Sequence, residues 1–253
     1  MWELHTEGEW AALELFPGAS VKGLTPELLP MLPDAVRAAE QMPGVKSLLL
    51  AGGARQFCIG ATAEYLSHLA RSTRGERLEH LKSGQRWITA LLESNLRSVA
   101  LLRGSVSGFG IDLCMACDVR VADSSVSMAS AYDRLGLVPD GGGLLLVSRL
   151  SSLEFATDFF AGRRSWNDRD LMLAGLVHAS IPDLEGTPES LIGEASSLIG
   201  PCRANFAACK GLARSLDTEE LRAHLDECAE IQADLIPKID PKLLNLLSRL
   251  QSV

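Results

Sequence analysis

Short apolar runs alternate with glycine-rich turns and helix-like stretches along the first two thirds of the chain. Val45–Ala51 and Val99–Leu102 are apolar runs of strand length, and glycines follow each of them. Beyond the second set of glycines, Ile111–Cys117 is an apolar stretch that suits a buried helix. The pattern therefore predicts a repeated unit in which a buried strand leads through a glycine turn into a helix.

The same pattern of apolar and polar residues predicts further helices and strands. Trp10–Phe16 is an apolar strand that ends at Pro17 and Gly18. Thr25 opens a helix with proline at its first position, which runs to about Gln41 with an irregular early course. Helical periodicity from Arg77 to Leu92 connects the two units. The later part predicts helices at 144–150, 152–161, 168–174, 187–199, 203–214 and 218–236, and short strands at 118–122, 125–129 and 176–180.

Composition limits the class of protein. The 253 residues are 47% hydrophobic and 22% charged, as in an ordinary globular chain. A net charge of −8 argues against nucleic acid or an anionic membrane surface as a partner. The apolar runs fall well short of the roughly 18 residues that span a bilayer. The N-terminal residues do not resemble a signal peptide, so we expect a cytoplasmic protein.

The six cysteines are scattered through apolar sequence, which favours reduced thiols in the core over a disulfide framework. Cys114 and Cys117 form a C-x-x-C pair, but they lie in an apolar helix and no second pair stands at zinc-finger spacing. We therefore expect no metal site. His68 and His80 lie in a charged connecting region, and we expect both to be solvated.

The two glycine turns carry the first functional signal. A strand that ends at glycines and restarts as a helix leaves main-chain N–H groups unpaired, and these suit an anion or a developing oxyanion. Two such turns, at 52–61 and 104–110, can donate to one oxygen. Asp112, Tyr132 and Asp140 follow closely in the sequence. Oxyanion donors beside a candidate base indicate chemistry on a carbonyl compound.

Four strings together resemble the crotonase (enoyl-CoA hydratase/isomerase) superfamily: FCIGA at Phe57–Ala61, SVSGFGID at Ser105–Asp112, ACDVRVA at Ala116–Ala122 and LGLVPDGG at Leu135–Gly142. The resemblance implies an α/β fold with a ββα spiral core, which we assign to residues 1–200. A helical C-terminal lobe would then occupy 201–253. The resemblance also implies a homotrimer or a dimer of trimers.

The same resemblance implies a substrate and a site. Its members act on acyl thioesters of coenzyme A or of an acyl carrier protein, so the thioester carrier belongs to the substrate and no separate cofactor is expected. The main-chain N–H groups of Ala61 and Phe109 would hold the oxygen of a thioester enolate. Tyr65, Gly108 and Gly110 would help to bind the substrate.

Departures from the family pattern indicate the reaction. Hydratases of the family place two glutamates around one water, and those positions match Asp112 and Tyr132 here. Asp140 stands where a group of isomerases carries its single acid, and one carboxylate can move a proton along an enolate. We therefore expect an isomerase whose catalytic set is Asp140, Asp112 and Tyr132. Tyr132 would be a wall or a hydrogen-bond donor, since a phenol is a poor base at neutral pH.

Three alternatives stay open. The first is a hydratase or dehydratase that uses Asp112 with Asp140 or Tyr132. The second is a decarboxylase in which the two amides hold the enolate and Tyr65 assists. The third is a trimeric scaffold without catalysis.

A finer similarity is to crotonase-like enzymes of polyketide pathways that decarboxylate carrier-bound thioesters. It rests on Phe57–Leu66 followed by Thr73–Glu76. Those enzymes use a tyrosine, a lysine and a C-terminal histidine. Tyr65 matches the tyrosine, whereas residues 67–72 hold no lysine and Gln232 stands at the histidine position.

Three arginines follow the first turn closely, at Arg71, Arg74 and Arg77. A basic rim on an acidic protein would steer an acidic carrier protein toward the site. The sequence therefore predicts that a carrier-bound acyl group is handled better than the same group on coenzyme A.

Overall fold

A six-stranded sheet forms the base of the fold in the computed structural model, which describes residues 3–18, 23–53, 55–162, 164–184, 186–215 and 218–251. The strand order is β1-β2-β3-β5-β7-β9, and all neighbours are parallel except the β1–β2 pair. The strands span Leu4–Glu7 (β1), Trp10–Glu14 (β2), Ser47–Ala51 (β3), Arg97–Leu102 (β5), Val119–Asp123 (β7) and Ala179–Ile181 (β9).

A second, smaller sheet is built from three parallel strands in the order β4-β6-β8. These are Gln56–Cys58 (β4), Ser105–Ser107 (β6) and Ser127–Ala129 (β8), each following a strand of the large sheet in the chain. Each then leads into a helix: α2 (Ala63–Arg71), α4 (Phe109–Ala116) and α5 (Tyr132–Leu135). This confirms the expected ββα spiral, with one correction: the turns at 52–61 and 104–110 each contain a short strand.

The early helices differ in detail from the prediction. The segment expected as one helix from Thr25 to Gln41 is divided into the 3₁₀ turn η1 (Pro26–Leu28) and α1 (Met31–Gln41). Pro30 stands at this junction and has no N–H to continue a helical ladder. The helix α3 (Arg74–Glu93) begins earlier than its apolar periodicity indicated, because Thr73 and Glu76 form a capping box at its start.

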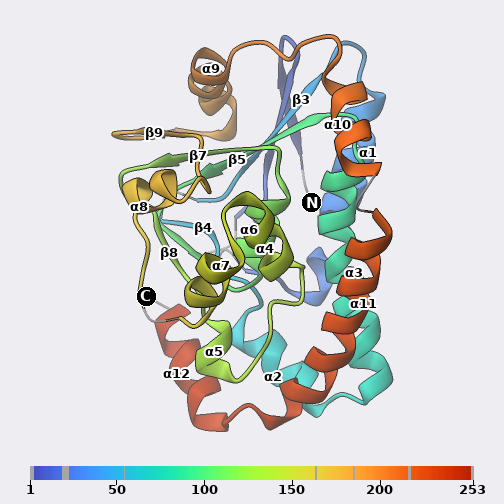
Figure 1. The fold of residues 1–253 in the computed structure, drawn as a ribbon, viewed down its shortest axis with the longest axis vertical. Helices are drawn as coiled ribbons and strands as arrows, with labels where there is room; N and C mark the ends of the chain where they lie inside the picture. Colours follow the sequence, from blue (N-terminus) through green and yellow to red (C-terminus); the bar gives the residue numbers. More distant parts are fainter. Residues whose placement is uncertain are drawn as a thin grey trace.

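The second half of the chain is largely helical, as expected. Its helices are α6 (Gly143–Leu150), α7 (Leu153–Phe160), α8 (Asp168–Leu173), α9 (Pro188–Ile199), α10 (Phe206–Ser215), α11 (Thr218–Leu235), η2 (Ile236–Lys238) and α12 (Pro241–Gln251). In Figure 1, α11 runs beside α3 and α12 lies next to α2. α12 lies beyond the last helix that periodicity predicted. No helix in the described ranges is long and apolar enough to cross a membrane.

The central strands are buried on both faces, which explains their continuous apolar sequences. Alternate residues of β3 point to opposite sides: Leu48 and Leu50 join the main core, whereas Leu49 and Ala51 join a smaller one. The smaller core lies under α9, which stands apart from the other helices in Figure 1. Apolar residues of α11 and α12 belong to the main core, so the C-terminal helices share it with the spiral.

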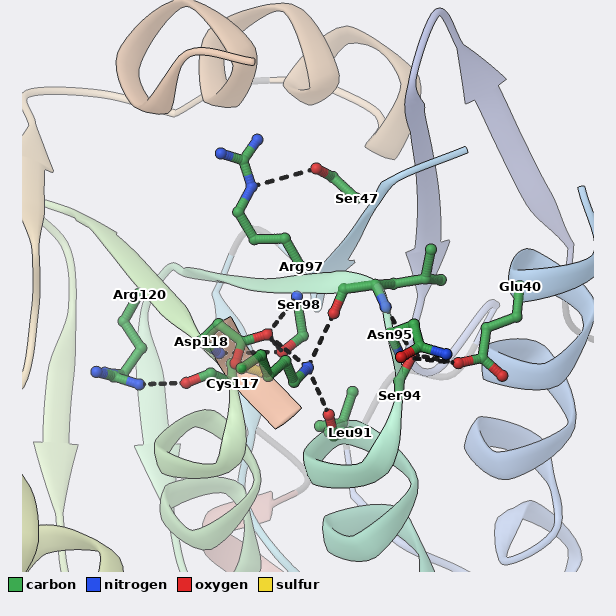
Figure 2. A network of polar contacts seen from close by, with 12 residues as sticks. Glu40, Ser47, Leu91, Ser94, Asn95, Arg97, Ser98, Cys117, Asp118 and Arg120 are labelled. Carbon is green, nitrogen blue, oxygen red and sulfur yellow. Dashed lines mark hydrogen bonds and ion pairs between the residues drawn. The ribbon is translucent and has the colours of Figure 1, made fainter. Parts of the chain in front are cut away.

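A buried polar network ties α10 to this framework (Figure 2). The ammonium group of Lys210 donates to the carbonyl oxygens of Leu91 (2.9 Å) and Leu96 (2.8 Å) and to the carboxylate of Asp118 (2.8 Å). The same carboxylate accepts from the main-chain N–H and the hydroxyl of Ser98, each at 2.8 Å. The network therefore fixes α10 to the end of α3 and the start of β5.

Candidate active site

A cavity lies where the ββα units meet the C-terminal helices. Its walls are mainly apolar and include Leu24, Leu66, Leu69, Leu137 and Leu247. Polar side chains enter at a few points only: Tyr65, His80, Ser107, Tyr132, Asp140 and Gln232. An apolar cavity with a few convergent polar groups is typical of a small-molecule site.

The first glycine turn leaves the N–H of Ala61 on the side away from its strand partner. Leu24 and Ala61 form a parallel bridge, in which the N–H of Leu24 donates to Gly60 O (2.8 Å) and Leu24 O accepts from the N–H of Thr62 (3.1 Å). In such a bridge the central residue directs its own N–H and C=O to the other side. Ala61 lines the cavity.

The second turn places Phe109 at the first position of α4, after Gly108 as the N-cap. N–H groups in the first turn of a helix have no partner within that helix. A Cβ atom added at Gly60 would lie 2.9 Å from the nitrogen of Phe109, so the two turns are in direct contact. Both glycines have positive φ, 81° at Gly60 and 52° at Gly108. The turn that carries Ala61 therefore lies directly against the start of α4, where Phe109 stands.

Gly110 is required for packing. A Cβ atom there would lie 2.0 Å from the carbonyl oxygen of Cys58, which is backbone and has no room to move. Gly110 therefore lets α4 pack against β4.

The two aspartates have different surroundings. Asp112 is completely buried, and its oxygens accept from the N–H of Gly143 (2.6 Å) and from the hydroxyl of Tyr132. Asp140 lines the cavity, and its carboxylate has two long contacts, to Tyr132 Oη and Gln232 Nε2, each at 3.5 Å. Of the two aspartates, Asp140 lines the cavity and Asp112 does not.

Burial raises the pKa of both carboxyl groups. It raises the pKa of Asp140 to about 6, although hydrogen bonds from its own main chain and from Tyr132 act in the opposite direction. Burial, with the charge of Asp140 as a second cause, raises the pKa of Asp112 well above the ordinary value. A carboxylate with a pKa of about 6 is ionised at neutral pH and still basic enough to accept a proton.

Two glutamines hold the segment that carries Asp140. The side-chain amide of Gln85 on α3 donates to Asp140 O (2.8 Å) and to Leu225 O (2.6 Å). Gln232 on α11 accepts from the N–H of Val138 (3.0 Å). From the sequence, Gln232 was noted only through the family resemblance, and Gln85 was missed. The one available signal for Gln85 was a polar residue among apolar positions of a predicted helix.

Tyr65 lines the cavity as expected, but its partner was not foreseen. Its hydroxyl lies 2.9 Å from His80 Nδ1, and His80 also lines the cavity. The expectation that His80 is solvated is therefore wrong, because α3 presents its ring to the phenol. His68 is exposed and its ring lies 5.9 Å from that of His80. Burial raises the pKa of Tyr65, so its hydroxyl stays protonated.

The predicted basic rim is mostly absent. Arg77 is buried and donates to the carbonyl oxygens of Ala233 and Ser72. Arg74 is paired with Glu230 (2.6 Å) and Asp234 (2.8 Å) of α11. Both arginines therefore fasten α11 to α3, and of the three only Arg71 is exposed without such an ion pair among the described contacts.

The cysteines are free thiols, and all are buried except Cys209, which is exposed and so departs from the expected core position. Cys114 and Cys117 are directed at main-chain carbonyl oxygens within α4. Within the described ranges no three His, Cys, Asp or Glu side chains are grouped so as to hold a metal ion.

The spiral of ββα units, together with two amide-bearing turns that meet at an apolar cavity, is the arrangement of a crotonase-fold enzyme. Residues 19–239 match the model of the enoyl-CoA hydratase/isomerase family, and the chain belongs to that family.

Its relatives catalyse more than one reaction. The chain is 25% identical over 232 residues to a crotonyl-CoA hydratase of Syntrophomonas wolfei, covering 91% of this chain and 86% of that protein. It is 26% identical over 170 residues to an ethylmalonyl-CoA decarboxylase of Xenopus tropicalis, covering 67% and 55%. An enoyl-CoA hydratase structure from Bacillus halodurans superposes with a TM-score of 0.84 at 21% identity, covering 98% and 99%. Family membership alone therefore leaves the reaction open.

Proposed function

We propose that the protein is an enoyl-thioester isomerase that moves a double bond by an allylic proton shift. The observation that carries the proposal is the placement of Asp140, a carboxylate that lines the cavity beside the two amide-bearing turns. One base suffices for this reaction, because the proton removed from one carbon of the acyl chain is returned to another.

The proposed reaction conserves all atoms. The thioester oxygen of a 3-enoyl substrate accepts hydrogen bonds from the N–H groups of Ala61 and Phe109. The carboxylate of Asp140 takes a proton from Cα, and the electron pair moves onto the oxygen as a dienolate. Asp140 then returns the proton to Cγ, which yields the 2-enoyl thioester. Fixed main-chain dipoles in a cavity of this kind stabilise the developing charge without reorganising.

The surroundings of Asp112 argue against hydration. A hydratase of this family needs two carboxyl groups to hold and activate one water. Here both oxygens of Asp112 already accept hydrogen bonds, from Gly143 and from Tyr132. Tyr132 itself keeps its proton, because burial raises the pKa of the phenol well above its ordinary value. The second carboxyl group that a hydratase with two acids would need is therefore missing.

We propose coenzyme A as the thioester carrier. The relatives named above are called hydratases and decarboxylases of coenzyme A thioesters. The arginines expected to attract a carrier protein are largely engaged within the chain, at Arg74 and Arg77. The proposal needs no cofactor beyond the thioester itself.

The test is to incubate the purified protein separately with a 3-enoyl-CoA and a 2-enoyl-CoA and to follow products by chromatography. Interconversion of the two isomers without a water adduct is expected. A 3-hydroxyacyl product as the main outcome would replace isomerisation by hydration, and unchanged substrates over a range of acyl chains would contradict catalysis of this class.

A further inference from the structure

The helix α12 delivers one polar side chain to the first glycine turn. Gln251, at the end of α12, accepts a hydrogen bond from the N–H of Ala63 (2.8 Å) and directs its amide nitrogen to the carbonyl oxygen of Ala61 (3.4 Å). About 190 residues separate these partners in the chain. α12 packs on α2, and Leu247, one helical turn earlier, lines the cavity.

Gln251 and Leu24 hold opposite edges of the same short segment. Leu24 pairs with Gly60 O and with the N–H of Thr62. The remaining edge carries the C=O of Ala61 and the N–H of Ala63, and both face the carboxamide of Gln251. A carboxamide has one donor and one acceptor side by side and so acts here as a further strand would. The Ala61 residue is thereby fixed from both sides.

This contact also satisfies a buried donor. Ala63 is the first residue of α2, so its N–H has no partner within the helix. Thr62 caps a different donor, the N–H of Tyr65 (3.2 Å). Ala63 is 4% exposed and Gln251 is 9% exposed, which leaves little access for water. Loss of the Gln251 side chain would leave the N–H of Ala63 buried and unpaired, and such a group forces a local rearrangement.

We infer that Gln251 is a positioning residue that aims the N–H of Ala61 at the thioester oxygen. This inference rests on the proposed function, in which that N–H is one of two oxyanion donors. Misplacement by about 1 Å of a group in an active site can lower turnover by about 100-fold. Gln251 thus links the position of α12 to the proposed reaction without contacting the substrate.

The kinetic test compares Gln251→Leu, which removes both contacts, with Gln251→Glu, which keeps only the acceptor for Ala63. The matched control is Arg249→Gln, an exposed position on the same turn of α12. We expect kcat/KM to fall by about 10- to 100-fold for Gln251→Leu, by less for Gln251→Glu, and not for the control. An unchanged kcat/KM in Gln251→Leu would contradict positioning.

A second readout separates positioning from general loss of structure. A thioether analogue lacks the carbonyl oxygen of the corresponding acyl thioester, so only the thioester uses the two amides. The wild type should bind the thioester analogue more tightly, and Gln251→Leu should lose this preference while still binding the thioether. Equal discrimination in both proteins would overturn the inference.

Hydrogen exchange at the amide of Ala63 tests the anchor without any assay of function. Its protection should decrease in Gln251→Leu and stay unchanged in Arg249→Gln. Unchanged protection in Gln251→Leu would overturn the inference whatever the reaction is. If the wild type showed no preference for the thioester, the proposal of an oxyanion hole would be wrong. The exchange result would still decide whether Gln251 anchors the turn.

Discussion

The hydroxyl of Tyr132 donates to the carboxyl group of Asp112, which does not line the cavity. Its oxygen also lies 3.5 Å from Asp140, too far for a strong bond. Because the phenol proton is directed to Asp112, Asp140 receives only weak stabilisation of its charged form. Asp112 therefore holds Tyr132 and Gly143 in place, and the carboxylate of Asp140 remains basic.

Replacing Asp140 by Asn should remove activity and increase stability. Turnover should fall by about 100-fold or more, as for loss of a general base. Burial raises the pKa of Asp140 to about 6, so the ionised form destabilises the folded protein at neutral pH. An amide of the same shape lacks this effect, and the free energy of unfolding should rise by about 1–3 kcal/mol. Urea unfolding at neutral pH measures this change. An active Asp140→Asn enzyme would rule out the proposed base.

The pH dependence should report the same carboxyl group. Activity should rise through pH 6 as Asp140 loses its proton, and then level off. Because the folded pKa lies above the unfolded value of about 3.9, the native state binds more protons between these two values. The contribution of Asp140 to stability is therefore lost as the pH rises through that window. A rate profile that is flat across it would count against Asp140.

Asp112 should respond differently to two substitutions. Burial raises the pKa of Asp112 and so favours its neutral form, which Asn imitates. Asp112→Asn should therefore keep activity within about 10-fold of the wild type. Asp112→Ala removes both acceptors, leaves the N–H of Gly143 unpaired and opens a cavity, and should lower the free energy of unfolding by about 2–4 kcal/mol. If Asp112→Asn is inactive while Asp140→Asn is active, the two roles are reversed.

The ring of Phe109 should matter for packing and substrate shape, and its N–H for the reaction. The ring edge faces Gly84 of α3, where an added Cβ would lie 4.0 Å away, and Gly141, where it would lie 2.9 Å away. Phe109→Ala keeps the N–H and should lower the free energy of unfolding by about 3 kcal/mol. Compact substrates should still turn over, and bulkier acyl groups should be accepted better. Inactivity at unchanged stability would show that the ring itself takes part in the reaction.

The Lys210–Asp118 pair should be a large source of stability. Its side chains are 4% and 10% exposed, and Lys210→Met removes the ammonium group that pairs with a buried carboxylate. The free energy of unfolding should fall by about 3–5 kcal/mol, measured by urea. Lys82→Met breaks the exposed pair with Asp226, where the side chains are 49% and 65% exposed, and should change stability by less than about 1 kcal/mol. Similar effects at both positions would contradict a buried network.

The central strands of the large sheet could be predicted because burial on both faces requires a continuous run of apolar residues, as in Val99–Leu102. Of the small sheet only β8 was predicted, as the strand expected at 125–129, whereas β4 and β6 have three residues each and lie within the glycine turns, where no alternation of apolar residues marks a strand. Such segments become strands only because their neighbours hold them in parallel.

Some residues of the site could likewise be predicted from the sequence, and others could not. Asp140, Ala61 and Phe109 lie in local strings whose order along the chain carries the signal. Gln251 and His80 do not, because a single polar residue on a helix looks solvated until its partner is known. For Gln251 that partner lies 188 residues away, and no local pattern encodes such a distance.

The parallel pairing of β4 with β6 has a consequence for how this protein can change over generations. Neighbouring strands lie about 4.8 Å apart, so the interval between the turns that follow them is set by the hydrogen-bond ladder. Inherited substitutions at positions 61 and 109 alter side chains and leave an N–H in place unless proline appears. The shape of the cavity can therefore change from one descendant sequence to the next, while the two proposed donors to a carbonyl oxygen stay in place.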